Sequence, residues 1–213
     1  MPESEDMSCY PPKRLLIVEE ALRSTGFGHW YEYIRTIVDG VRREGGEVQV
    51  MVHRQAEPGI VESLGAAPLL RYSAWDKIYD APSALKRYAG GLKHNLRLAK
   101  DVRRFLAGAE RYDVVLVPTV LAHHVLAWYW NLRTLGGRKF DRLATIFVNT
   151  PGQRLANGDF CFPPNTWFMR AVLRRMKGYQ DKRSFATVAE TRLAASGLDP
   201  HPWAWRRPAR SGA

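Results

Sequence analysis

Cysteine is scarce in this sequence, and long apolar segments are missing from it. Only two of the 213 residues are cysteines, Cys9 and Cys161, which are too few for a disulfide framework and lack the spacing of metal ligands. No apolar run approaches the roughly 20 residues that a membrane-spanning helix needs. The acidic, proline-containing start is the reverse of a secretory leader. These absences exclude a disulfide-rich secreted protein. They favour the cytoplasm, with no bound metal and no resident cofactor.

Acidic residues are also few relative to basic ones. The sequence has 21 Asp and Glu against 32 Lys and Arg, which gives a formal net charge of +11. Such a charge favours anionic partners, namely nucleotides, phospholipid head groups or nucleic acid. No helix-turn-helix, zinc-finger or RNA-binding signature accompanies the charge, so nucleic acid is the least expected of these partners.

The first cluster of basic residues falls between residues 86 and 104. It consists of Lys86, Arg87, Lys93, Arg97, Lys100, Arg103 and Arg104. Charge runs of this kind usually form the solvated face of a helix. The apolar residues of the same segment, among them Leu92, Leu96 and Phe105, recur at helical spacing and are expected to face the core.

Short apolar runs alternate with stretches of helical periodicity along the chain. Strands are expected over residues 14–19, 48–52, 68–72, 112–119, 143–148 and 184–189. Helices are expected over residues 30–44, 92–106, 123–135, 167–177 and 190–196. Alternation of this kind predicts an α/β fold, a single Rossmann-like doubly wound parallel sheet with helices on both faces. The domain is expected to cover residues 14–198, between a disordered tail over 1–13 and an irregular tail over 199–213.

Of the segments of this sequence, the loop after the first expected strand is the most similar to a phosphate-binding turn. Gly26, Phe27, Gly28 and His29 lie between that strand and a helix, where glycines let the backbone approach a ligand and a helix N-terminus offers N–H groups. The third glycine of a dinucleotide fingerprint is missing. The loop is therefore either a site for the phosphates of a nucleotide or an ordinary turn.

Two histidines follow the strand expected over residues 112–119. His123 and His124 stand at the start of a helix, where an imidazole with a pKa close to neutral can act as a base or hydrogen-bond a sugar hydroxyl. They are the candidate catalytic residues. The alternative is that one caps the helix or packs under Trp128 while the other faces solvent.

Polar side chains also follow two later strands. Asn149 and Thr150 stand after residues 143–148, and Glu190 follows residues 184–189. Ligands of parallel sheets bind beyond the carboxyl ends of the strands. An amide, a hydroxyl and a carboxylate in that place suit a polyhydroxylated substrate, although Asn149 and Thr150 also fit a simple turn and Glu190 also fits a helix cap.

Three segments together carry a resemblance to a known family. They are the run RLLIV from Arg14 with the Gly26 and Gly28 loop, YDVVLV from Tyr112, and VAETRL from Val188. From Arg14 to Ser196 the layout resembles the amino-terminal domain of a GT-B glycosyltransferase, most similar to the family-four group. The resemblance implies half of a GT-B architecture, truncated before the carboxy-terminal domain that binds the donor and supplies a pair of glutamates.

The resemblance implies an acceptor-binding half of an enzyme that transfers a sugar from a nucleotide-sugar donor. Its expected ligands are a carbohydrate or lipid-linked acceptor and, weakly, the donor, and activity would need a partner subunit or domain. The family often places a histidine where Thr119, Asn149 and Thr150 stand here. These three residues, with Glu190 and Arg192, are therefore the expected substrate-binding residues. The alternative is a non-catalytic Rossmann-like domain that binds a nucleotide or another anion.

Relatives that work on lipid-linked acceptors give the basic helix a further meaning. A cationic helix face can lie on anionic head groups at the inner membrane surface. With Leu92, Leu96 and Phe105 expected in the core, the sequence predicts electrostatic docking rather than insertion.

Overall fold

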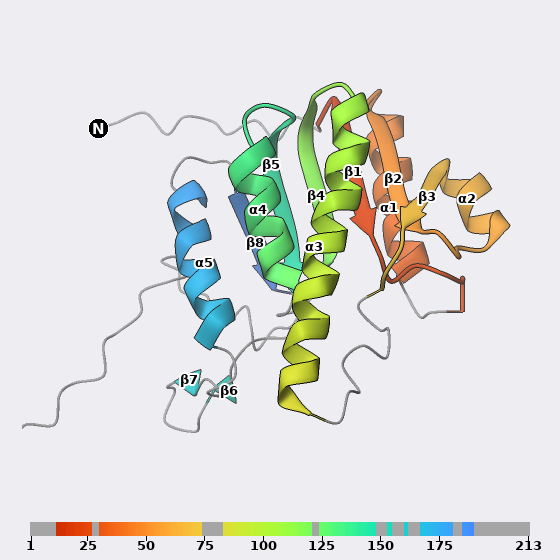
Figure 1. Ribbon diagram of the computed structural model, residues 1–213. Helices are drawn as coiled ribbons and strands as arrows, with labels where there is room; N and C mark the ends of the chain where they lie inside the picture. The colour runs from red at the N-terminus through yellow and green to blue at the C-terminus, as the bar shows by residue number, and fades with distance from the viewer. Residues whose placement is uncertain are drawn as a thin grey trace, which may run out of the picture.

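The computed structural model describes residues 12–26, 30–73, 83–120, 124–147, 153–154, 160–161, 167–180 and 185–189 (Figure 1). One six-stranded sheet forms its centre, in the order β3-β2-β1-β4-β5-β8, and every pair of neighbours is parallel. The strands are β1 (Arg14–Glu19), β2 (Glu47–His53), β3 (Ala66–Leu70), β4 (Tyr112–Val120), β5 (Phe140–Phe147) and β8 (Phe185–Ala189). The predicted Rossmann-like parallel sheet is confirmed.

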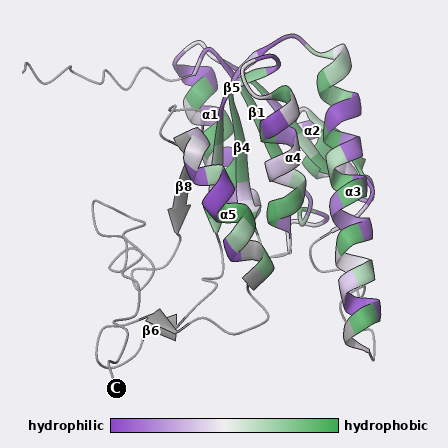
Figure 2. Ribbon diagram, turned by 60° about the vertical axis from the view of Figure 1, so that its left-hand side comes forward, coloured by the Kyte–Doolittle hydropathy of each residue, from purple (hydrophilic) through white to green (hydrophobic). Residues whose placement is uncertain are grey.

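Helices cover both faces of the sheet, as the alternation predicted. The helices are α1 (Trp30–Arg43), α2 (Pro58–Leu64), α3 (Ala84–Gly108), α4 (Val125–Leu135) and α5 (Trp167–Gln180). In Figure 1, α3, α4 and α5 lie in front of the sheet, whereas α1 lies behind it. Figure 2 shows the apolar strands enclosed between these two helical layers.

Strand β1 shows how the sequence divides its apolar side chains between the two layers. Leu15 and Ile17 belong to the core cluster on the side of α1 and α2, and Leu16 and Val18 to the cluster on the side of α3, α4 and α5. Successive side chains of a strand point to opposite faces. An unbroken apolar run is therefore what a strand covered on both faces requires.

Helix α3 is longer than the sequence predicted, and its apolar face is different. It begins at Ala84, where the hydroxyl of Ser83 accepts a hydrogen bond from the N–H of Lys86 at 3.3 Å. Leu98 and Val102 are buried, but Leu92 and Leu96 are exposed. The expectation that Leu92 and Leu96 belong to the core is wrong, because the buried face of α3 carries His94, Leu98 and Val102, and the two leucines lie on another face of the helix.

Other differences from the prediction are small. Helix α2 was not predicted, and neither was the short antiparallel pair β6 (Gln153–Arg154) and β7 (Phe160–Cys161). The helix expected over 190–196 and the irregular tail over 199–213 lie outside the described residues. In the described part of the chain, no helix is both long and apolar enough to cross a membrane.

The turn between α4 and β5 has no room for a side chain at Gly136. A Cβ added to Gly136 would lie 2.4 Å from the carbonyl oxygen of Leu132, whereas one added to Gly40 on α1 would meet nothing within 4 Å. We expect Gly136→Ala to lower the free energy of unfolding by roughly 1 to 2 kcal/mol. Gly40→Ala should raise it by about 0.5 to 1 kcal/mol. Urea unfolding followed by circular dichroism measures both changes. A Gly136→Ala protein as stable as Gly40→Ala would contradict the clash with the carbonyl oxygen of Leu132.

Candidate functional site

The candidate site lies where the order of the strands reverses. Strand β1 pairs with β2 on one side and β4 on the other, so the chain moves outward in opposite directions from β1 and β4. In open parallel sheets such a point leaves a crevice beyond the carboxyl ends of the strands, where ligands bind. Glu20 directly follows β1, and His124 directly precedes α4, the helix that follows β4.

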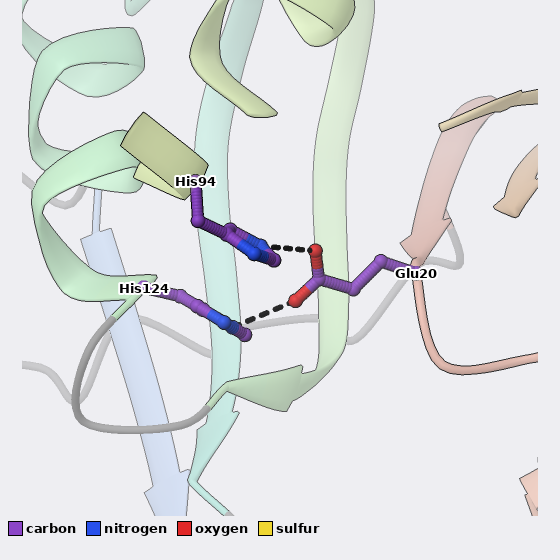
Figure 3. Close-up of side chains that lie close together, drawn as sticks. All are labelled: Glu20, His94 and His124. Atoms are coloured by element: carbon purple, nitrogen blue, oxygen red, sulfur yellow. Dashed lines mark hydrogen bonds and ion pairs between the residues drawn. The ribbon is translucent and has the colours of Figure 1, made fainter. Parts of the chain in front are cut away.

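Three side chains meet at this point: Glu20, His94 of α3 and His124 (Figure 3). One carboxylate oxygen of Glu20 lies 2.9 Å from Nε2 of His94, and the other lies 2.7 Å from Nδ1 of His124. The side chains of Glu20, His94 and His124 are 5%, 0% and 1% exposed. The carboxylate therefore joins two helices to the end of the first strand inside the protein.

The two imidazole rings are stacked. Their centroids are 4.6 Å apart, and their planes differ by 10°. An ionised carboxylate can only accept hydrogen bonds, so Nε2 of His94 is the protonated nitrogen of that ring. Nδ1 of His124 is the nitrogen in contact with the carboxylate, and a proton on Nδ1 leaves the lone pair of a neutral ring on Nε2.

The charge of Glu20 is set by its two partners. Burial by itself raises the pKa of Glu20, but the positive charge and hydrogen bond of His124, followed by those of His94, outweigh burial and lower the pKa from 4.5 to about 2. Hydrogen bonds and nearby positive charge both favour the ionised form of a carboxyl group. Glu20 is therefore a carboxylate at neutral pH.

Glu19, the last residue of β1, has the opposite environment. Burial raises the pKa of Glu19 from 4.5 to about 8, and this effect outweighs the nearby hydroxyl of Thr119 and the hydrogen bond from the N–H of Ala21, which favour ionisation. That N–H lies 2.8 Å from Oε1 of Glu19. Two adjacent carboxyl groups thus differ in charge at neutral pH, Glu19 being protonated and Glu20 ionised.

Neighbouring side chains hold α3 and α4 in place around the cluster. Asn95 accepts a hydrogen bond from the N–H of Ala127 at 2.8 Å and donates one to the carbonyl of Gly91, also at 2.8 Å. The ring of Tyr72 packs at a tilt against His94, with 5.8 Å between centroids. These contacts restrict where the two histidine rings can move.

Glu20, His94 and His124 are also the chemical types that bind divalent metals. One ligand atom from each residue lies within 4.8 Å of the others. The lone pair of an imidazole nitrogen lies in the plane of its ring. The lone pairs of two nearly parallel rings therefore lie in parallel planes and do not point at one common ion. A metal would require one ring to turn and both bound protons to leave. In the described geometry, the carboxylate is paired with both imidazoles.

Three of the residues predicted from the sequence can be located. His124 is in the cluster, Thr119 is buried on β4 next to Glu19, and Gly26 lies after β1. The N–H of Gly26 donates to the hydroxyl of Ser24 at 3.0 Å, the hydrogen bond of a local turn. The other predicted site residues lie outside the described residues: Phe27, Gly28, His29, His123, Asn149, Thr150, Glu190 and Arg192.

The sequence reasoning missed Glu20 and His94. Glu20 had a usable signal, since it directly follows a buried strand that precedes a candidate ligand loop. His94 lies in a run of cations, and nothing local distinguishes it from them. Only the packing of α3 on the sheet brings His94 to a residue 74 positions earlier.

No family model matches the chain, and no curated protein matches it. Among solved structures, the chain is similar to one described as the glycotransferase of kitacinnamycin, with a TM-score of 0.44 and 14% sequence identity. The match covers 80% of this chain and 40% of that chain, so this chain spans less than half the length of the solved protein.

Proposed function

We propose that this chain is the acceptor-binding domain of a glycosyltransferase, which holds a carbohydrate or lipid-linked acceptor while a sugar is transferred from a nucleotide-sugar donor. The observation that carries this proposal is the contact between Glu20 and His124 at the reversal point of the sheet. An imidazole held by a carboxylate at a ligand crevice is suited to proton transfer with a hydroxyl.

The proposed chemistry begins with the acceptor hydroxyl near Nε2 of His124. As the hydroxyl oxygen forms a bond to the anomeric carbon of the donor sugar, the bond from that carbon to the diphosphate breaks and the nucleoside diphosphate leaves with the electron pair. The hydroxyl proton passes to Nε2, and the ionised Glu20 stabilises the resulting imidazolium through Nδ1. Because His124 is buried, neighbouring segments must move before the acceptor reaches this nitrogen.

The donor is expected to bind weakly to this chain alone. The proposed transferase requires a donor-binding domain from elsewhere in the enzyme or from a partner subunit. Binding of the acceptor is therefore the property to test first, since it requires this chain alone.

Saturation-transfer NMR with the full chain tests the acceptor site. The probes are a panel of monosaccharides and glycolipid head groups, with UDP and GDP as nucleotide probes. We expect signals from at least one sugar, and we expect His124→Gln to weaken that binding by about 10-fold or more because a polar partner of a hydroxyl is lost. Tyr112→Phe is the control, since Tyr112 is also buried but begins β4, at the opposite edge of the sheet.

Two outcomes would contradict the proposed acceptor site. Nucleotide binding without sugar binding would favour the non-catalytic nucleotide-binding domain. Equal loss of sugar binding in His124→Gln and Tyr112→Phe would show that His124 acts only through the stability of the fold.

A further inference from the structure

The N-terminal half of α3 is an exposed arm with an apolar stripe. Its large apolar side chains are unusually accessible: Leu85 is 78% exposed, Tyr88 61%, Leu92 49% and Leu96 51%. These residues are three or four positions apart, so they lie along one side of the helix. Large apolar side chains gathered on a surface mark sites of interaction more often than isolated ones do.

The arm extends past the sheet rather than lying on it. In Figures 1 and 2, the N-terminal part of α3 continues beyond the ends of the strands, on the edge where the strands end. The buried side chains of α3 begin at His94 and Asn95 and continue with Leu98, Val102 and Leu106. The helix is therefore anchored from His94 onward and projects before it, and the stripe runs from the projecting part to Leu96 on the exposed side of the anchored part.

Cations border the stripe, and anions are absent from the arm. Between Ala84 and Lys100 the sequence has five Lys or Arg residues and no Asp or Glu. Lys86, Lys93 and Lys100 are all exposed and recur every seventh residue, which is two helical turns, so they form a row beside the stripe. Arg97 also lies on this side, where its guanidinium stands 4.6 Å from the ring centre of Tyr72.

We propose that this arm docks the protein on an anionic lipid bilayer, with the apolar stripe entering the interface and the lysine row contacting the head groups. Helices that lie in the membrane interface combine an apolar face with Lys or Arg beside it. Long lysine side chains reach the head groups while their methylene stems lie against apolar surface. Anionic lipid is the occupant that satisfies both features.

The charge pattern argues against a second copy of the chain as the occupant. Two such arms would bring five cations of one against five of the other, with no acidic residue of the arm to pair with them.

The docked orientation also has a geometric consequence. His94 follows Lys93 directly, so the bilayer surface would lie near the edge of the sheet that holds Glu20 and His124.

Vesicle flotation of the full chain tests this assignment independently of any transferase activity. The probes are vesicles of pure phosphatidylcholine and vesicles of equal parts phosphatidylcholine and phosphatidylserine. We expect binding to the mixed vesicles alone. Both Lys86→Glu/Lys93→Glu and Leu92→Ser/Leu96→Ser should lower the partition coefficient by about 10-fold or more, since each removes one of the two attractions. The control Arg175→Glu/Lys177→Glu makes the same charge change at exposed positions of α5 and should bind as the wild type does.

Several results would overturn the docking arm. Unchanged binding of Leu92→Ser/Leu96→Ser would show that the stripe does not enter the interface. No binding of the wild type to mixed vesicles, or equal binding to pure phosphatidylcholine, would remove the anionic bilayer as the partner. A dimer that is detected by light scattering and dissociates in Leu92→Ser/Leu96→Ser would assign the arm to a second copy of the chain. An oligonucleotide that displaces the protein from the vesicles, with the same affinity for Leu92→Ser/Leu96→Ser as for the wild type, would assign the arm to nucleic acid.

Discussion

Glu20→Gln is expected to lower the free energy of unfolding by about 3 kcal/mol at neutral pH, because it leaves two buried imidazoles without their carboxylate. The effect should depend on pH in a defined way. The pKa of Glu20 is lowered in the folded protein from 4.5 to about 2, so its stabilising contribution is complete above the unfolded value and is lost as the pH falls between these two values. Urea unfolding at a series of pH values measures this difference.

The control for this substitution is Glu62→Gln on the exposed face of α2. It removes the same charge without touching a buried partner, and we expect a change within about 0.5 kcal/mol. A Glu20→Gln protein that retained the acid dependence of the wild type between pH 4.5 and pH 2 would show that other carboxyl groups cause it.

Glu19→Gln is expected to act in the opposite direction and to stabilise the protein by about 2 kcal/mol at neutral pH. Burial raises the pKa of Glu19 from 4.5 to about 8. A raised acid pKa means that folding takes up a proton, so stability is lost as the pH rises from the unfolded value toward the folded one. Glutamine has no proton to take up, and its amide oxygen can still accept the hydrogen bond from the N–H of Ala21.

The pH dependence separates this effect from a simple improvement in packing. The gain from Glu19→Gln should vanish near pH 4 and grow until the pH passes the folded value of about 8. Urea unfolding across this range measures the gain, again with Glu62→Gln as the reference. A constant gain at every pH would contradict a buried protonated Glu19.

Most of the fold could be predicted because its signals are local. The apolar run from Leu15 to Val18, with Arg14 before it and Glu19 after it, indicated the limits of β1 correctly, since the middle of a strand buried on both faces is apolar. Helix α2 was missed because its seven residues are too few to show a period clearly. The buried face of α3 could not be identified, since Leu92 and Leu96 recur at helical spacing as Leu98 and Val102 do, and only contacts with distant segments decide which side is covered.

The candidate site was predicted in part, for a related reason. His124 could be singled out because it follows a strong strand and stands where ligands bind in parallel sheets. His94 could not, because its role depends on a contact across 74 positions of sequence. Pairing between distant residues is set by topology, and no local pattern of residues reports it.

The Glu20 cluster also bears on the order in which the chain can become stable. Residues 14–53 form a complete strand, helix and strand, yet the carboxylate that follows the first strand finds its donors only on α3 and at the start of α4. The charge of Glu20 is compensated inside the protein only when residues up to His124 are present, because burial of an unpaired carboxylate is costly. The carboxyl edge of the N-terminal unit is therefore buried without an unpaired charge only when α3 and the start of α4 are in place.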